Sequence, residues 1–295
     1  MTFQPTRAPR SRLARLGVVL DTRNPVARLG EIARMCDDAG IDVLWVSGPK
    51  HGPDPDTAWT SGEALREIAA STTRVRVGLS LSSDPAADAG LVATLGTSPS
   101  TIARRMEVTV PADVADGGIR EWLPDGVPLS VPTPTVAAME IAARVADDAV
   151  LSAVAVQDLG ATAAQLRACC ERANRDRDTL GIALEVPVSI GRTRAEAEAR
   201  ADGESLFDIV GAPDDVGVFG TLEQCQARVI VLAHAGVTDL RCYLPNNPDI
   251  HDVIAQLTAI AIGTVEVLSP GAPRSRDPDP PETWGGRGIG SLGGQ

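Results

Sequence analysis

The sequence of 295 residues predicts a single (β/α)8 TIM barrel, and three observations carry that prediction. Short apolar segments alternate with helical segments along the chain, which is the pattern of parallel strands joined by helical crossovers. Eight such strands fall within about 250 residues, which is the number and the length that this barrel needs. Hydrophobic residues make up 43% of the chain, so a core of that size can be buried.

The first predicted strand is a continuous apolar run of the kind that is buried on both faces. Pro25 then suits the first turn of a helix that ends at Ala39-Gly40. Continuing this alternation, we expect strands at 16–20, 41–46, 74–81, 105–110, 127–131, 149–156, 182–190 and 237–244.

Helices are expected between the strands, at 25–40, 57–71, 84–103, 134–146, 160–180, 193–207, 221–235 and 250–267. Two of them follow the seventh strand, so one helix more than a minimal barrel is expected there. The segment 111–126 after the fourth strand contains two Pro and three Gly residues. We therefore expect a loop or a broken helix there, and so a shortened fourth helix.

The organisation along the chain follows from these elements. Residues 1–15 form an N-terminal arm, 16–268 form one barrel domain, and 269–295 form a tail. The tail is rich in Pro, Gly, Arg and Asp, so it cannot supply a core and is expected to be extended or disordered.

Composition excludes several functions. A net charge of -12 opposes binding of nucleic acid through the overall field. No apolar run approaches the roughly 18 residues of a membrane span, and the Arg-rich start lacks the apolar core of a secretion signal. The cysteines form no CxxC pair and none lies near a His at ligand spacing, which predicts a reduced, cytoplasmic protein without a metal site. They are Cys36, Cys169, Cys170, Cys225 and Cys242.

Aromatic residues are scarce, with four Trp, three Phe and one Tyr. A planar cofactor would therefore be flanked mainly by aliphatic side chains or by one of Trp45, Trp59 and Trp122. Trp45 lies on the second predicted strand, where its indole either stacks on a ring or fills the core.

Several short motifs occur in a fixed order in the first part of the chain. They are Asp38-Ala39-Gly40, Trp45-Val46, the segment 70–73 (ASTT) and the segment 74–78 (RVRVG). In this order and spacing, the sequence resembles the luciferase-like monooxygenase family, whose members use FMN or coenzyme F420. The segments 140–150, 170–178, 188–197 and 220–243 are similar to later parts of the family, so the resemblance covers residues 16–268.

The resemblance implies a flavin- or F420-dependent oxidoreductase or monooxygenase that acts on a small organic substrate. The chain departs from the family where the chemistry would occur. Ser47 and Gly48 stand where F420-dependent members commonly carry Asp-His, and His51 lies three residues late. The segment 100–110 keeps neither the Gly-Arg-Phe motif nor the Gly-x-Gly loop. The alternative is a degenerate barrel that no longer catalyses and acts as a binding or partner protein.

Proton handling is the least defined part of this hypothesis. His51 is one candidate, and the alternative for it is a solvated loop histidine. Glu107 on the fourth strand is a second candidate, since some F420 enzymes carry an acid there. The family's large helical insertions are also missing, so the pocket is either open or closed by a partner, for instance in a homodimer.

Whatever the family, the carboxyl ends of the strands form the working face of this barrel. The resemblance places the cofactor ring against the third strand, with Trp45, Ser47, Ser80 and Ser82 beside it. It also implies a cis peptide bond between residues 79 and 82, which costs about 3 kcal/mol when no proline is involved.

A phosphate needs free backbone N–H groups at a helix N-terminus. Gly160 and Thr162 meet this requirement after the sixth strand, and Gly191, Arg192 and Thr193 meet it after the seventh. Gly220-Thr221 is a third, weaker candidate. The alternative for each is ordinary helix capping. The same sites would also serve a different enzyme, a non-flavin barrel with a phosphorylated substrate.

Overall fold

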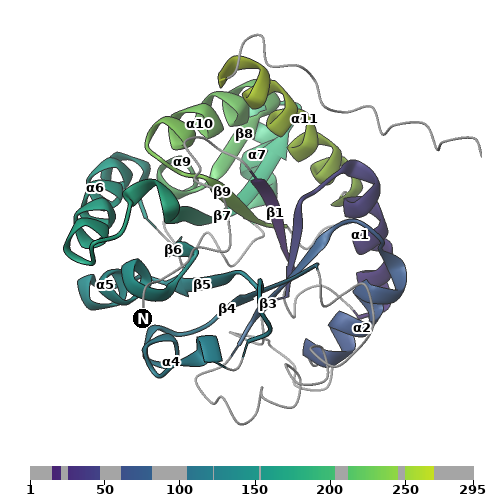
Figure 1. Cartoon of the computed structure of the whole chain (residues 1–295). Helices are drawn as coiled ribbons and strands as arrows, with labels where there is room; N and C mark the ends of the chain where they lie inside the picture. Colours follow the sequence, from purple (N-terminus) through teal and green to yellow (C-terminus); the bar gives the residue numbers. More distant parts are fainter. Residues whose placement is uncertain are drawn as a thin grey trace, which may run out of the picture.

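The computed structural model describes residues 15–20, 26–46, 61–81, 105–121, 123–152, 154–202, 212–244 and 250–268. Figure 1 shows a ring of strands surrounded by helices. The order β6-β5-β4-β3-β2-β1-β9-β7 closes through pairing of β7 with β6, and every pairing is parallel. The predicted (β/α)8 barrel is therefore confirmed.

The barrel strands each correspond to one predicted strand. They are β1 (Arg15–Leu20), β2 (Val43–Val46), β3 (Arg76–Ser80), β4 (Met106–Thr109), β5 (Leu129–Pro132), β6 (Asp148–Ser152), β7 (Gly181–Gly191) and β9 (Asp239–Tyr243).

The described helices follow the predicted order as well, with one additional short helix at 213–216 that was not predicted. They are α1 (Val26–Ala39), α2 (Ser61–Ser71), α4 (Ala112–Asp116), α5 (Val136–Val145), α6 (Val156–Arg172), α7 (Arg194–Ala201), α9 (Pro213–Val216), α10 (Leu222–His234) and α11 (Ile250–Leu268). The fourth helix is short, as predicted, because α4 has five residues and Gly118 follows it with a φ of +90°. A 3-10 turn, Ile119–Glu121, then leads toward β5. The helix predicted at 84–103 lies outside the described residues.

One strand was not predicted. The 11-residue β7 pairs with β9 over 183–187 and then, over 188–191, with β8 (Val218–Thr221). Phe219 of β8 packs with Ala197 and Ala201 of α7 in a small cluster of their own. The long β7 thus extends beyond the barrel ring and carries α7 and β8 at its carboxyl end.

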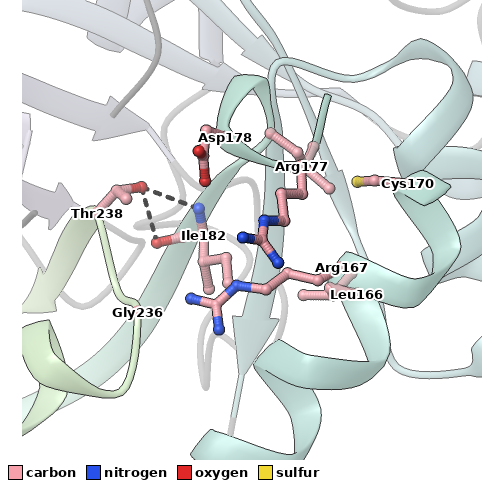
Figure 2. A pocket seen from close by; sticks show the side chains of 9 residues that line it. Leu166, Arg167, Cys170, Arg177, Asp178, Ile182, Gly236 and Thr238 are labelled. Atoms are coloured by element: carbon pink, nitrogen blue, oxygen red, sulfur yellow. Dashed lines mark hydrogen bonds between the residues drawn. The ribbon is translucent and has the colours of Figure 1, made fainter. Parts of the chain in front are cut away.

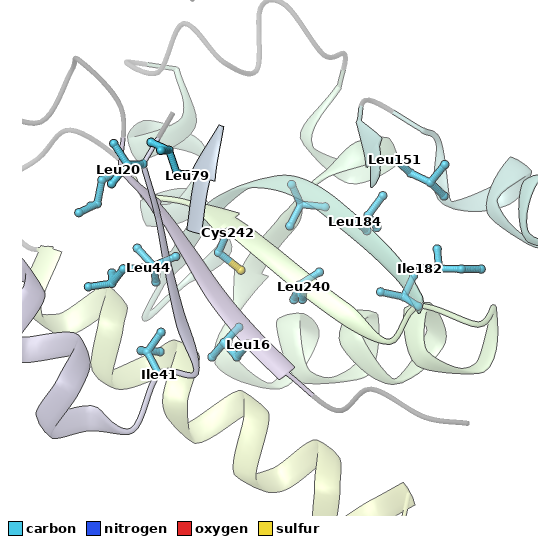
Figure 3. Packing of buried hydrophobic residues seen from close by; sticks show 14 of the residues in the cluster. Leu16, Leu20, Ile41, Leu44, Leu79, Leu151, Ile182, Leu184, Leu240 and Cys242 are labelled. Atoms are coloured by element: carbon cyan, nitrogen blue, oxygen red, sulfur yellow. The ribbon is translucent and has the colours of Figure 1, made fainter. Parts of the chain in front are cut away.

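The barrel wall has two differently composed faces, because side chains alternate along a strand. On β1, Leu16, Val18 and Leu20 belong to the main hydrophobic cluster, which lies between the strands and the helices. Figure 3 shows part of this packing around β1, β9 and β7. Val19 instead joins Val43 in a separate interior cluster. Each buried Leu or Val contributes about 2 kcal/mol through the hydrophobic effect.

Two of the motifs behind the sequence resemblance have a structural role. Asp37, at the end of α1, accepts the backbone N–H groups of Thr73, Arg74 and Val75, at 2.9, 3.0 and 2.6 Å. Burial alone would raise the pKa of Asp37, but these hydrogen bonds lower it more strongly. Asp37, directly before the Asp38-Ala39-Gly40 motif, thus joins the end of α1 to the segment 73–75 that enters β3.

A second junction joins α6 to α5. Arg175 donates to the backbone carbonyls of Ala142, Ala143 and Ala146, at 3.4, 3.2 and 2.6 Å. These carbonyls lie at the C-terminal end of α5, where Ala142 also accepts the Ala146 N–H, so the guanidinium caps this end of the helix.

Candidate active site at the carboxyl ends of the strands

An indole lies inside the barrel in space left by two glycines. Trp45 on β2 is flanked by Gly17 on β1 and Gly78 on β3. A Cβ atom at Gly78 would lie 2.1 Å from Cε3 of the indole, and one at Gly17 would lie 3.2 Å from Nε1. Because neither glycine carries a side chain, the indole can lie against the inner wall of the barrel at these two positions.

A guanidinium covers this indole. Arg241 on β9 stacks its Cζ 3.6 Å from the ring centroid of Trp45. Its two terminal nitrogens donate to the Thr109 and Ser130 hydroxyls, at 3.0 and 2.8 Å, on the opposite side of the barrel. Burial lowers the pKa of Arg241, and neighbouring carboxylates, led by Asp239, partly offset this. The side chain thus forms a floor across the barrel.

This arrangement decides between the two roles expected for Trp45. Its residue is only 2% exposed, and the guanidinium occupies one ring face. Trp45 therefore fills the core, and the expectation that it stacks on a cofactor ring is wrong for this arrangement.

A charged network lies on the amino-terminal side of the floor. Arg15 forms ion pairs with Glu107 and Asp239 and lies 3.6 Å from Asp148. Arg76 also pairs with Glu107, at 2.6 Å. Burial lowers the pKa of Arg15, but the three carboxylates raise it further, so the guanidinium stays charged. Glu107, one of the candidate acids, is fully buried in this network and does not face the carboxyl ends of the strands.

On the other side of the floor, a polar cluster lies at the mouth of the barrel. Glu185 on β7 accepts hydrogen bonds from the Ser152 hydroxyl on β6, at 2.7 Å, and from the Tyr243 hydroxyl on β9, at 3.4 Å. Arg241 lies 4.0 Å below the same carboxylate. The Glu185 side chain keeps 12% of its surface exposed, so this carboxylate is accessible from the mouth. The mouth thus combines a carboxylate, two hydroxyls and a fixed positive charge.

This cluster was not predicted, because most of the candidate residues follow a strand, whereas Glu185 and Tyr243 lie within strands. One signal could have found Glu185, because it is the single charged residue in the apolar segment 181–191 (GIALEVPVSIG).

The first predicted phosphate site is wrong in its local structure. The helix α6 begins at Val156, four residues earlier than expected, so Gly160 and Thr162 lie inside it. The Thr162 hydroxyl donates to the Asp158 carbonyl, at 3.0 Å. In this position, the backbone N–H groups of both residues belong to the helix ladder and are not available to an anion.

The second predicted phosphate site does lie at a helix N-terminus. Thr193 caps α7, and Gly191 is required there because a Cβ would lie 2.6 Å from the Ala197 nitrogen. The Arg192 N–H, however, donates to the Glu196 carboxylate at 2.9 Å. This backbone donor is therefore occupied by the helix itself, which matches ordinary capping.

The third candidate, Gly220-Thr221, also shows ordinary capping, since the Thr221 N–H donates to the Gln224 side chain at 2.9 Å in a capping box of α10.

Ser80, at the end of β3, is half-buried at the mouth. Ser47, Ser82 and His51 lie outside the described residues. The peptide bonds described between 79 and 81 are not cis.

A small pocket lies at the opposite end of the barrel (Figure 2). Arg167 of α6 and Arg177 line it, close to the amino ends of β7 and β9. Its volume is about 30 Å³, room for only a few water molecules. Among the described residues, no group of His, Cys, Asp or Glu side chains is arranged to hold a metal ion.

No family model matches the chain, and no curated protein matches its sequence. Solved structures do match its fold. A coenzyme F420-dependent tetrahydromethanopterin reductase from Methanopyrus kandleri is 13% identical with a TM-score of 0.67, over 85% of this chain and 99% of that one. An F420-dependent secondary alcohol dehydrogenase, in complex with an F420-acetone adduct, is 14% identical with a TM-score of 0.68 and the same coverage. A riboflavin lyase with modified FMN is 12% identical with a TM-score of 0.67, over 85% and 92%.

At these identities, the likeness concerns the fold. The barrel is shared with enzymes that work with F420 and with FMN, as the sequence motifs suggested.

Proposed function

We propose that the protein is an oxidoreductase that binds F420 or FMN over the mouth of the barrel and acts on a small organic substrate. One observation carries this proposal. The accessible cluster of Glu185, Ser152 and Tyr243 lies at the carboxyl ends of three neighbouring strands, where enzymes with this barrel place their active sites. The fold itself is shared with F420- and FMN-dependent enzymes.

The described residues fit the two parts of such a cofactor unequally. The polar edge of its ring presents carbonyl and N–H groups, which hydroxyls such as Ser80, Ser152 and Tyr243 can bind. The backbone donors predicted for its phosphate are occupied by Glu196 and Gln224. The exposed Arg192 side chain is the remaining candidate for phosphate contact in the described region.

When bound, the cofactor would supply the hydride chemistry. The chain's own contribution starts from the floor, since Trp45 and Arg241 close the barrel from below. Any ligand is therefore held at the level of Glu185 and Tyr243 and cannot sink into the barrel. The charge of Arg241 favours oxygen atoms that carry negative charge at this level.

The direct test is a titration of the purified protein with FMN and with F420, followed by cofactor fluorescence. We expect one of them to bind at micromolar concentration. If neither binds at tens of micromolar while the far-UV spectrum shows a folded protein, the proposal is wrong.

Arg192→Ala provides a sharper test of phosphate contact. We expect the dissociation constant for FMN to rise about tenfold, the loss of one charge-assisted contact, and that of riboflavin, which lacks the phosphate, to stay unchanged. Arg177→Ala, at the other end of the barrel, serves as the matched control. An equal loss for FMN and riboflavin would contradict phosphate contact at Arg192.

The second candidate function is a barrel that binds a ligand or partner without catalysis. The helix N-termini that are already capped by their own side chains favour it. Such a protein would bind neither cofactor in the titration above.

We also propose a cytoplasmic location. All five cysteines are free and buried, which fits a reducing compartment. No helix among the described residues is long and apolar enough to cross a membrane.

A homodimer that covers the mouth is a further proposal, to be tested by the mass of the protein in solution.

A further inference from the structure

We propose that Glu185 is the proton acceptor of this site, that Tyr243 passes the proton to it, and that the substrate is an alcohol. This inference rests on the proposed oxidoreductase function, and it names the catalytic pair and the substrate class of the same mouth.

Glu185 and Tyr243 are positioned as a hydrogen-bonded pair at the mouth. Glu185 and Tyr243 come from adjacent strands, and their oxygens are 3.4 Å apart. Glu185 also accepts from Ser152, at 2.7 Å. Two hydroxyl donors thus direct one carboxylate, which keeps its rotamer fixed while 12% of it remains accessible. A general base must be accessible to the group whose proton it accepts, and its orientation must be fixed.

A buried guanidinium lies beside the Glu185 carboxylate. Arg241 faces Glu185 from below at 4.0 Å, and it holds this place through Thr109 and Ser130. The guanidinium thus places a fixed positive charge beside this carboxylate. The same guanidinium also stabilises negative charge on a substrate oxygen above it. A proton acceptor beside a fixed positive charge suits an oxygen atom that loses a proton during the reaction.

The other acidic side chains of the interior are excluded by their position. Glu107, Asp148 and Asp239 gather around Arg15 on the amino-terminal side of the floor, and all three are fully buried. A substrate at the mouth cannot reach them past Trp45 and Arg241. Among the described interior carboxylates, Glu185 alone is both accessible and backed by a proton-carrying hydroxyl.

A bound F420 or FMN in its oxidised form would accept hydride, so the C–H bond of the alcohol carbon would break with both of its electrons leaving as hydride. In the same step, the O–H proton of the alcohol would move to the Tyr243 oxygen, while the phenol proton would move to the Glu185 carboxylate. The substrate would become a carbonyl compound by this two-electron oxidation, and Glu185 would return its proton to water.

The test compares Glu185→Gln and Tyr243→Phe with Glu140→Gln, a matched change on the exposed surface of α5. Cofactor binding is followed by fluorescence, and oxidation of a panel of primary and secondary alcohols by cofactor reduction. We expect both site variants to bind cofactor like the wild type and to lose about 100-fold or more in turnover, the range of general base catalysis. The rise of the wild-type rate with pH should disappear in Glu185→Gln.

A second readout requires no cofactor. Tyr243 is the single tyrosine of the chain, so its ionisation is visible by ultraviolet absorbance. Removing the neighbouring negative charge should move the titration midpoint in Glu185→Gln to lower pH, with no movement in Glu140→Gln.

The outcomes separate the two proposals. If the wild type binds neither cofactor, the oxidoreductase function and the catalytic pair both fall, even when the tyrosine titration confirms that the two side chains interact. If the cofactor binds but no alcohol is oxidised, the substrate class is wrong and the oxidoreductase function survives. Unchanged turnover and pH dependence in Glu185→Gln, or an unmoved tyrosine midpoint, would overturn the role of the pair.

Discussion

Replacing Arg241 by Met should destabilise the barrel, because this side chain organises the floor. It is 1% exposed, stacks on Trp45 and donates to Thr109 and Ser130. Methionine can occupy most of the space but makes none of these polar contacts. It also leaves Glu185 without the positive charge that lies 4.0 Å away.

The size of the effect follows from these contacts. Removing one partner of a buried ion pair costs about 3–5 kcal/mol, and the partial exposure of Glu185 indicates the lower end. A protein of this size loses about 2–4 °C in Tm for each kcal/mol. We therefore expect Arg241→Met to cost about 3 kcal/mol and to lower Tm by about 6–12 °C. Compared with Arg241→Met alone, the double variant Glu185→Gln, Arg241→Met should regain about 1 kcal/mol or more in the free energy of unfolding, because the unpaired charge of Glu185 is gone.

Urea and thermal unfolding of the variants measure these values. Arg144→Met is the matched control, since Arg144 pairs with Asp116 on the surface and both side chains are about half exposed. Exposed pairs contribute about 0–1 kcal/mol, so the control should unfold close to the wild type. If Arg241→Met is as stable as this control, or if the second substitution gives no recovery, the floor does not depend on Arg241 as described.

Three further substitutions test the rest of the fold by thermal and urea unfolding. Gly78→Ala places a Cβ 2.1 Å from the interior indole and should cost about 1–3 kcal/mol, whereas Gly160→Ala, with open space around its Cβ, should be neutral or stabilising; equal effects would contradict the close approach. Asp37→Asn should cost about 2 kcal/mol near neutral pH. Because folding lowers the pKa of Asp37, its contribution is present above about pH 4 and is lost as the pH falls further, so the two proteins should converge in acid; a difference that grows in acid would refute this. Arg175→Ala should cost about 2–3 kcal/mol through lost capping of α5, and Arg177→Ala should cost little.

The fold could be predicted from the sequence because its signals are local. Most barrel strands contain a short apolar run, and the longer helices have apolar residues at helical spacing. Two short elements were not predicted, α9 and β8. The strand β8 has four residues, contains Gly220 and precedes a helix directly. Its strand conformation depends on pairing with the extended end of β7, and a tertiary contact of this kind leaves no periodicity in the sequence.

The site could be predicted only in part, because its contacts join strands that are distant in the sequence. The role of Trp45 depends on Gly17, Gly78 and Arg241, which come from three other strands. Their juxtaposition depends on the register of the closed barrel. The sequence placed Trp45 correctly on β2 but could not show that a guanidinium covers its ring.

The phosphate sites show a different limit. Gly-Arg-Thr and Gly-Thr are correct signals for helix N-termini, and α7 and α10 do begin there. The same signals also include Glu196 and Gln224 three residues beyond each Thr, and these side chains occupy a backbone donor themselves. A capping box and an anion site therefore use the same donors, and a ligand must displace the side chain to bind.

The interior of the barrel shows why chemistry is expected at the mouth and nowhere else in the described structure. An acidic chain has placed Arg15 and Arg241 inside the barrel together with Glu107, Asp148 and Asp239, and Arg76 also pairs with Glu107, so three cations balance these three carboxylates. Buried ion pairs of this kind contribute little to net stability, because the cost of removing the charges from water offsets their attraction. Their physical effect is to fill the barrel with groups that cannot move without leaving a charge unpaired. The one carboxylate that remains accessible above them, Glu185, is therefore held in a fixed position at low reorganisation cost, which is the property that a proton acceptor requires.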